Sequence, residues 1–539
     1  MKQFRRIGIF EQPPSLPKEV VPYVQSLLDI ITQLQEQVQL QAESIQMLRD
    51  EIAVLKGQKG RPIIKPSRMD QKTEKDDSPD KKSRSKRLDS GEPAKTAKLE
   101  IHDSRKVKAV DVPAESRFLG YREFTVQDLK ISPFNTRYFL ERWETPDGHV
   151  LQAEPPVELA GLHFGTDLRA FLLYQHHHCH VTQPKLHEQL LEWGIDISAG
   201  QINALLTFGH DTFTAEKSSL LKSGLAVSTA ITVDDSGARH QGKNGYVTVV
   251  SGPSFAWFGS ADNKSRIGFL THLHDGHPSY EVTDFALSHM RACGLKTAVI
   301  NLFREHSRDE GEEWSAYLLR LSVTSERHCR IVTEAALLDS LMKKGINPDL
   351  AIVSDGAGQF IMLEHGLCWV HTERLIHKLI PSNEEQRAAQ ENMRSEVWNY
   401  YRDLKSYQAT PTPEAAGLLN NRFDVLFKQK TGWITLDRLL ERIRMKKRDL
   451  LLVLRRPDVP LHTNASETDI RDYVKVRKIS GGTRSDIGRE CRDTFASLKK
   501  TCRKLGISFW GYLKDRIALT NQIPALDNII CLRAAVAKA

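Results

Sequence analysis

The stretch from Leu225 to Gly237 reads LAVSTAITVDDSG. Its β-branched and apolar residues predict a strand that ends in two adjacent acids, Asp234 and Asp235. Because side chains alternate between the two faces of a strand, only one of these carboxylates can bind a given metal ion. Two further strand-like runs follow at 246–251 and 255–260. We therefore predict a three-stranded antiparallel meander with an acid on its first strand.

A second acid follows a second apolar run. Leu350–Ser354 predicts a short buried strand, and Asp355 and Gly356 come directly after it. An acid beyond a buried strand, with a glycine beside it, leaves room for a ligand to approach. Taken alone, an ordinary aspartate in a strand-to-turn junction explains this pattern better.

A third acid opens a basic stretch. Asn464 is a candidate N-cap with Glu467 at the third helical position, which is the pattern of a capping box and gives Glu467 a purely structural role. The basic residues that follow favour chemistry instead; they are Arg471, Arg477, Lys478, Arg484, Arg489, Lys499, Lys500, Arg503 and Lys504. A metal-dependent nuclease needs this combination, because the acid binds Mg²⁺ and the bases hold phosphates.

The order strand-Asp, strand-Asp, helix-Glu resembles that of the DDE transposases, whose catalytic domain has the RNase H-like fold. The segments 233–240, 354–374 and 464–478 further resemble the three motifs of insertion-sequence family sixty-six, the TnpC-type transposases. Cys-Trp-Val-His at 368–371 is the most specific part. The resemblance extends from about Val20 to Ile517.

The resemblance implies a transposase that binds the terminal inverted repeats of a bacterial insertion sequence, cleaves DNA and joins its 3′ ends to target DNA. Asp234, Asp355 and Glu467 would be the catalytic acids and would bind Mg²⁺ or Mn²⁺. The candidate DNA-binding residues are Arg471, Arg477, Lys478, Arg484 and Arg489. The candidate structural motif beside the second acid is Cys368, Trp369, His371 and Arg374.

The spacing of Cys368 and His371 also suits half of a zinc site, which Cys329 or His377 could complete. No four-ligand set is visible, so we predict a structural role for this pair and no zinc. Family members often carry a CxxC zinc module farther upstream, but residues 110–156 contain no cysteine.

The residues before Glu467 also depart from the family pattern. His462, Thr463 and Asn464 stand where the family commonly has Asp-Asn-Asn, and Thr468 stands in place of an arginine. Neither change removes a catalytic acid.

The predicted fold is a multidomain α/β protein. Its parts are a tail (1–19), a coiled coil (20–57), a basic disordered linker (58–109), a small β-rich module (110–160), a helix-turn-helix-like domain (161–218) and an RNase H-like DDE domain (225–539) with a helical insertion at about 373–457. The coiled coil rests on apolar spacings of three and four over Val20–Leu55. It predicts a homodimer, although one helix lying on its own globular body would give the same pattern.

Two helices joined at Gly194 form the helix-turn-helix candidate. The first, Pro184–Trp193, would turn Leu186, Leu190 and Leu191 inward, and Ser198 would cap the second. Many helical hairpins look alike in sequence, so packing alone explains this one about as well as DNA binding. Before it, the run His176 to His180 cannot converge on one ion from consecutive helical positions, and we interpret it as a polar helix end.

Composition restricts the function classes. The chain has 539 residues and a net charge of +8, which is compatible with nucleic-acid binding. No apolar run is long enough to cross a membrane, and the seven scattered cysteines suit a reducing bacterial cytoplasm. The sequence contains no P-loop motif, so we do not expect the protein to use ATP. The alternative functions are an RNase H-fold nuclease without strand transfer, or a transposase-derived DNA-binding protein without catalysis. Accessory proteins encoded by the same element are further candidate partners.

Overall fold

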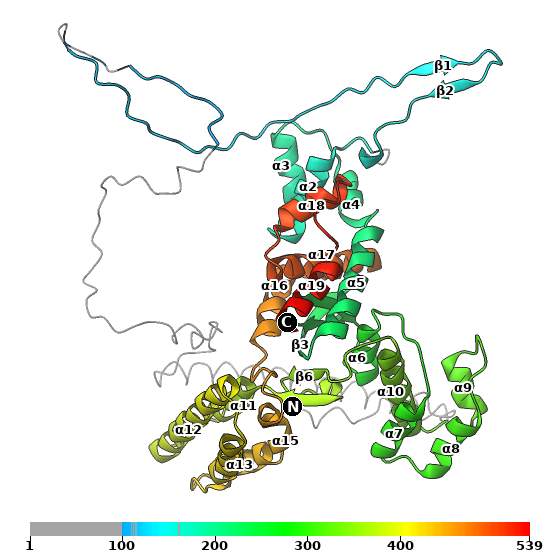
Figure 1. Cartoon of the computed structure of the whole chain (residues 1–539), viewed down its shortest axis with the longest axis vertical. Coiled ribbons are helices and arrows are strands. Elements are labelled where there is room, and N and C mark those ends of the chain that lie inside the picture. Colours follow the sequence, from blue (N-terminus) through cyan, green and yellow to red (C-terminus); the bar gives the residue numbers. More distant parts are fainter. Residues whose placement is uncertain (1–99, 109, 111–112, 114–115, 160–161, 539) are drawn as a thin grey trace, which may run out of the picture. The chain divides into compact units, whose positions relative to one another are not determined.

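The computed structural model describes residues 100–108, 110, 113, 116–159 and 162–538 (Figure 1). The predicted tail, coiled coil and most of the basic linker lie outside the described residues, and so does the predicted dimer seam. Within the described part, no helix combines the length and apolar character that a membrane span requires.

A mixed sheet forms the centre of the fold. Its strands are β3 (Ala230–His240), β4 (Lys243–Ser251), β5 (Ala256–Ala261), β6 (Ala351–Ser354) and β7 (Glu364–Leu367), in the order β5-β4-β3-β6-β7. The first three are antiparallel neighbours, which confirms the predicted meander. Strands β6 and β7 continue the sheet parallel to β3, and the short β8 (Gly482–Thr483) pairs with the far end of β3. This mixed α/β arrangement is consistent with an RNase H-like core.

The first strand begins later than its sequence pattern suggests. Residues up to Val227 belong to helix α5 (Asp211–Val227), and β3 starts at Ala230. Leu225 is buried in the main core together with Ile231 and Val233. The apolar run therefore serves two elements that pack into the same core, which is why it looks like one strand.

The edge strand β5 is covered by helix α17 (Asp486–Lys504). Its backbone N–H groups donate to side chains of that helix: Ala256 to the Thr501 hydroxyl at 3.1 Å and Phe258 to the Ser497 hydroxyl at 2.9 Å. An edge strand with free N–H groups is a template for unwanted pairing. Polar side chains on α17 satisfy this edge and fix the helix on the sheet.

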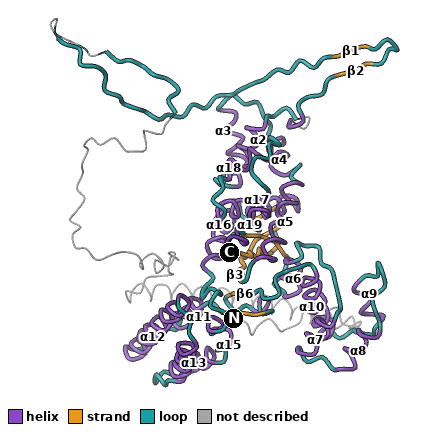
Figure 2. The backbone as a smooth tube through the Cα atoms, viewed as in Figure 1, coloured by secondary structure: helices purple, strands orange, loops and turns teal. Residues whose placement is uncertain are grey.

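Two helical segments interrupt the sheet (Figure 2). Between β5 and β6 lie α6 (Arg266–Leu273), α7 (Asp284–Ala292), α8 (Thr297–Glu305), α9 (Trp314–Arg320) and α10 (Glu326–Lys343). Between β7 and helix α16 (Asn464–Ser480) lie α11 (Trp369–His377), α12 (Glu384–Ala409), α13 (Pro413–Lys428), α14 (Ile434–Arg444) and α15 (Lys447–Leu450). Each segment has an apolar core of its own. The second covers the predicted insertion at about 373–457, whereas the first was not anticipated.

Upstream of the sheet the structure has a hairpin and a group of helices. Strands β1 (Arg142–Glu144) and β2 (Val150–Gln152) pair across the turn that contains Gly148, inside the predicted β-rich module. The helices are α2 (Thr166–His177), α3 (Gln183–Glu192) and α4 (Ala199–Thr207). Two C-terminal helices pack on this side of the chain: α18 (Phe509–Ile517) on α2, and α19 (Leu526–Lys538) on α5.

The predicted helical hairpin is α3 and α4. Ser198 caps α4 and forms a capping box with Gln201. Leu186 and Leu190 are buried as predicted, but Leu191 is 49% exposed, so its predicted inward position is wrong. The buried face of α3 is narrower than expected because only residues four apart point at α4 and the main core.

Candidate active site

The acidic doublet on β3 separates into two different environments. Asp235 contacts the Lys264 ammonium and accepts a hydrogen bond from the Gln359 amide at 2.6 Å. These partners neutralise its charge. Asp234 has no such cation among the described residues and instead accepts from the backbone N–H of Asp235 at 2.8 Å. Asp234 is therefore the member of the doublet that remains available to bind a metal ion.

The pKa of Asp234 depends on its burial and on the charges of three nearby residues. Burial raises its pKa to about 6, against a smaller lowering by the Asp235 N–H. The negative charges of Asp355 and Glu467 raise the pKa further, while His371 lowers it. The structure thus brings the three predicted acids, from three distant segments, into one local electrostatic field.

Sheet register explains how Asp355 reaches Asp234. Thr232 on β3 faces Val353 on the parallel strand β6, and each acid lies two residues beyond its member of this pair. Residues two apart point to the same face, so the two carboxylates emerge side by side. The next residue, Gly356, has φ +89° and a Cβ there would meet the Leu367 side chain at 2.7 Å, so the turn requires glycine.

Glu467 lies in the first turn of α16, but the predicted capping box is wrong. The helix begins at Asn464 and its N-cap is Thr463, which makes no side-chain cap. Because the N-cap lies one residue earlier than expected, Glu467 is the fourth helical residue and does not reach back to cap. Its Oε1 instead lies 3.3 Å from the Thr463 hydroxyl.

The Cys-Trp-x-His element ties this helix to the sheet. Cys368 follows β7 and starts α11. The Trp369 backbone N–H donates to the Leu461 carbonyl at 2.9 Å, and the Thr463 N–H donates to Cys368 Sγ at 3.4 Å. The Trp369 indole is buried and donates to the Leu450 carbonyl at 3.0 Å. These bonds fix the segment immediately before α16 and hence the position of Glu467.

Two basic side chains hold the Glu467 carboxylate. His371 Nε2 lies 3.7 Å from Oε1, and the Arg374 guanidinium lies 3.4 Å from Oε2. Burial acts to lower the pKa of His371, but its hydrogen bond and attraction to Cys368 and the charge of Glu467 outweigh burial and raise it. Burial acts to raise the pKa of Cys368, and the bond to His371 outweighs it and lowers that pKa. Cys368 and His371 thus each favour the charged form of the other, beside Glu467.

The acids fit a divalent metal. Asp234, Asp355 and Glu467 offer carboxylate oxygens, the ligands that Mg²⁺ and Mn²⁺ prefer. A cluster of three acids in which burial disfavours the charge of one is stabilised by a bound cation. Among the described residues, Cys368, His371 and Glu467 also have ligand atoms within 4.8 Å of one another. The predicted zinc half-site is therefore joined by Glu467, and not by Cys329 or His377.

Asp469 and Asp472, the other acids on α16, have structural partners. Lys504 lies 3.0 Å from Asp469, and Lys500 lies 2.8 Å from Asp472. The Asp469 carboxylate also accepts from the Ser251 hydroxyl on β4 at 2.8 Å. These acids join α16 to α17 and to the sheet, which leaves Glu467 as the acid of this helix that faces the other two.

The predicted DNA-binding residues fall into two groups. Arg477 contacts the Gly237 carbonyl, and Arg489 pairs with Asp262 at 3.0 Å, so both help to hold the fold. Arg471, Lys478 and Arg484 make no ion pair or hydrogen bond with the described part of the chain. Lys478 and Arg484 are exposed, and Arg471 is half-buried. These three are free to meet phosphates.

A mixed sheet with acids after two neighbouring strands and a third acid on a following helix is consistent with the catalytic core of the DDE recombinases. The family described as "Transposase IS66 family" matches residues 352–490, which include Asp355, the Cys-Trp-x-His element and Glu467. The chain is also 40% identical over 321 residues to the uncharacterized protein y4jO of Sinorhizobium fredii, covering 58% of this chain and 100% of that protein. The chain belongs to the IS66 family of transposases.

Proposed function

We propose that this chain is an active transposase that binds the terminal inverted repeats of a bacterial insertion sequence, cleaves DNA and joins the freed 3′ ends to target DNA. Family membership implies the DDE activity. The observation that carries the proposal for this particular chain is that the charges of Asp355 and Glu467 both act on Asp234. Three acids from separate segments that share one field can hold the divalent ions that metal-dependent phosphoryl transfer uses.

In this proposal Asp234, Asp355 and Glu467 hold the divalent ions. The ions, when bound, supply the charge that activates the attacking water or 3′-hydroxyl and stabilises the leaving oxygen in an in-line displacement. Asp234 must be deprotonated to bind them, so its proton leaves above about pH 6. His371 and Arg374 would orient the Glu467 carboxylate.

DNA binding is proposed for two regions. Arg471, Lys478 and Arg484 would contact phosphates near the acid cluster, since they lack partners in the described part of the chain. The hairpin of α3 and α4 would read the terminal repeats as a helix-turn-helix-like unit. A homodimer through residues 20–57 would hold two element ends together, and accessory proteins of the element would assist.

A cleavage assay on duplexes that carry the terminal inverted repeats, with Mg²⁺ or Mn²⁺ and a separate target plasmid, tests this proposal. A transposase nicks the 3′ ends and covalently joins labelled ends to the target. Cleavage without joined product would favour the nuclease alternative. Specific binding with neither product would favour a transposase-derived protein that has lost catalysis.

A further inference from the structure

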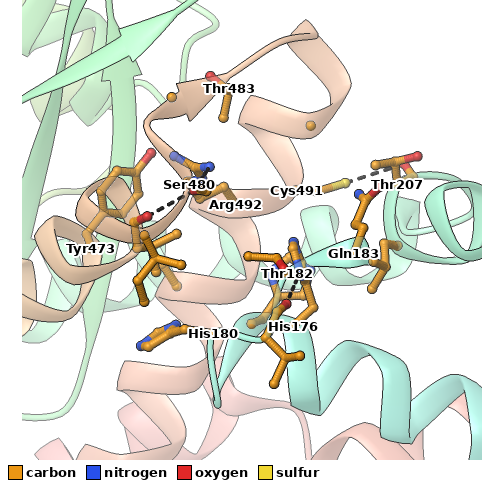
Figure 3. Close-up of a pocket in the computed structure, with 18 of the residues that line it drawn as sticks. His176, His180, Thr182, Gln183, Thr207, Tyr473, Ser480, Thr483, Cys491 and Arg492 are labelled. Carbon is orange, nitrogen blue, oxygen red and sulfur yellow. Dashed lines mark hydrogen bonds between the residues drawn. The ribbon is translucent and has the colours of Figure 1, made fainter. Parts of the chain in front are cut away.

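A cavity of about 590 Å³ lies between the helices α2–α4 and the pair α16 and α17 (Figure 3). Its wall includes the end of α2, the start of α3, β8 and the start of α17. Its cationic and imidazole side chains include His176, His177, His180, Arg484, Arg492 and Lys499. The sequence predicts a polar helix end at these histidines, but the His177 ring stacks on Phe495 with 4.3 Å between the ring centroids, and its Nε2 atom is buried.

The cavity wall carries more positive than negative charge, since Arg484, Arg492, Lys499 and Lys500 line it together with only Asp469 and Asp472. Lys499 is only 7% exposed, and it donates a hydrogen bond to the His177 carbonyl at 3.2 Å. Arg492 donates to the Ser480 hydroxyl at 3.3 Å and lies over the Tyr473 ring. Neither forms an ion pair with the described residues, because Asp469 and Asp472 pair with Lys504 and Lys500. Burial lowers the pKa of Lys499 to about 8, although the charge of Asp472 acts to raise it, so the charge of this buried ammonium is compensated only in part.

Unpaired hydrogen-bonding atoms line the same space. His177 Nε2 and His180 Nδ1 are buried and have no hydrogen-bond partner in the described part of the chain. Burial keeps the pKa of His177 well below its usual value and lowers that of His180 to about 4, which favours neutral rings. A neutral imidazole has one N–H, and a bound anion would favour the tautomer that places it on the unpaired nitrogen. Figure 3 shows His176 and His180 near the start of α3, whose cap residue Thr182 makes no side-chain cap. Free N–H groups in the first turn of a helix also favour an anion.

We propose that this cavity binds a phosphate group of the DNA backbone, held by Lys499 and Arg492 and by the unpaired imidazoles. An apolar ligand would leave these polar atoms unsatisfied, and a metal cation would be repelled. The identity of the phosphate as DNA rests on the proposed function, whereas the affinity for phosphate does not.

The position of the cavity suits a strand that also reaches the acids. Val476 lines the cavity and Glu467 lies on the same helix, nine residues earlier. At 1.5 Å per residue this is about 13 Å along the helix axis, or about four base steps of duplex. A phosphate in the cavity would therefore link the helices α2–α4 to the helix that carries Glu467.

Thermal unfolding of the full chain with inorganic pyrophosphate, against KCl of equal ionic strength, tests the phosphate site. We expect a saturable rise in Tm for the wild type and none for Lys499→Met, which keeps the side-chain length but removes the charge. Without added anion, Lys499→Met should melt at or above the wild-type temperature, because it removes a buried charge that is compensated only in part. The matched control is Arg442→Gln, an exposed arginine on α14 outside the cavity, which should respond as the wild type does. A wild type that responds no more to pyrophosphate than to KCl, or a Lys499→Met that responds equally, overturns the site.

The salt dependence of binding to a terminal-repeat duplex identifies the source of the phosphate. Lys499→Met should lose one phosphate contact, so the slope of the logarithm of the DNA-binding constant against the logarithm of salt concentration should become shallower by about one. The slope for Arg442→Gln should not change. A pyrophosphate response combined with an unchanged slope overturns the DNA assignment in favour of a free phosphate. If the wild type bound no DNA, the proposed function would fail while the pyrophosphate result would stand.

Discussion

Arg374 places its guanidinium 3.4 Å from Oε2 of Glu467, 93 residues farther along the chain. Together with His371 it supplies positive charge next to an acid that is proposed to bind a metal ion. Bound cations and these two side chains therefore compete for the same carboxylate. We therefore expect His371 and Arg374 to affect metal affinity as well as to position Glu467.

We predict opposite effects of Arg374→Gln on metal affinity and on rate. Loss of the guanidinium leaves the acid cluster more negative, so the Mg²⁺ concentration for half-maximal cleavage should fall, by about tenfold for a change of roughly 1.4 kcal/mol. The maximal rate should also fall, because Glu467 loses an orienting partner. Mg²⁺ titration of cleavage measures both. Arg448→Gln, at an exposed arginine on α15, is the control, and a simple loss of rate with unchanged Mg²⁺ dependence would reduce Arg374 to a structural role.

The metal-free protein should be stabilised by Asp234→Asn at neutral pH. The pKa of Asp234 is raised to about 6 in the folded state, from 3.8, so folding holds a proton that the unfolded chain releases. Stability from this group is therefore present at low pH and is lost as pH rises from about 4 to 6, by up to about 3 kcal/mol. Melting curves in EDTA should show Asp234→Asn above the wild type at pH 7.5, with the difference shrinking toward pH 4. A variant that melts below the wild type at pH 7.5 would contradict this.

Glu467→Gln should separate chemistry from structure. Gln retains an oxygen for Arg374 and the Thr463 hydroxyl but no charge for Mg²⁺, so the melting temperature should barely change. Cleavage should fall at least roughly a hundredfold, which corresponds to about 3 kcal/mol of transition-state stabilisation. Cleavage near the wild-type rate would remove Glu467 from the catalytic set.

Deleting residues 20–55 should leave a folded monomer. The apolar heptad spacing predicts that this segment holds the dimer, and it lies outside the described residues. Light scattering of the full chain and the deletion variant measures the mass of each. A deletion variant that remains dimeric would place the interface elsewhere.

The strands and the acids could be predicted because their signals are local. Asp234 and Asp355 follow apolar strand patterns and Glu467 opens a helix, and the resemblance of this order to that of the DDE transposases nominated all three. The predicted helix start was wrong by one residue, since the cap depends on where the Thr463 backbone is held by Cys368. That contact spans distant segments and leaves no local trace.

Long-range packing explains the remaining differences. The His177 ring stacks on Phe495, more than 300 residues away, so no pattern near the histidine run could show that it lines a cavity. Likewise, Glu467 joins Cys368 and His371 only because α11 and α16 meet. The helices between β5 and β6 were not predicted, because the order and spacing of the acids do not require them.

The most direct test of the account compares Asp234→Asn with Asp235→Asn in single-turnover cleavage of a terminal-repeat duplex with Mg²⁺. The two variants remove the same charge from adjacent residues, and the amide oxygen introduced by Asp235→Asn can still accept from Gln359, so each is the control for the other. We predict that Asp234→Asn loses at least roughly a hundredfold in rate with DNA binding intact, while Asp235→Asn stays within about tenfold of the wild type. Loss of cleavage in Asp235→Asn with near wild-type cleavage in Asp234→Asn would contradict the assignment of the catalytic acids.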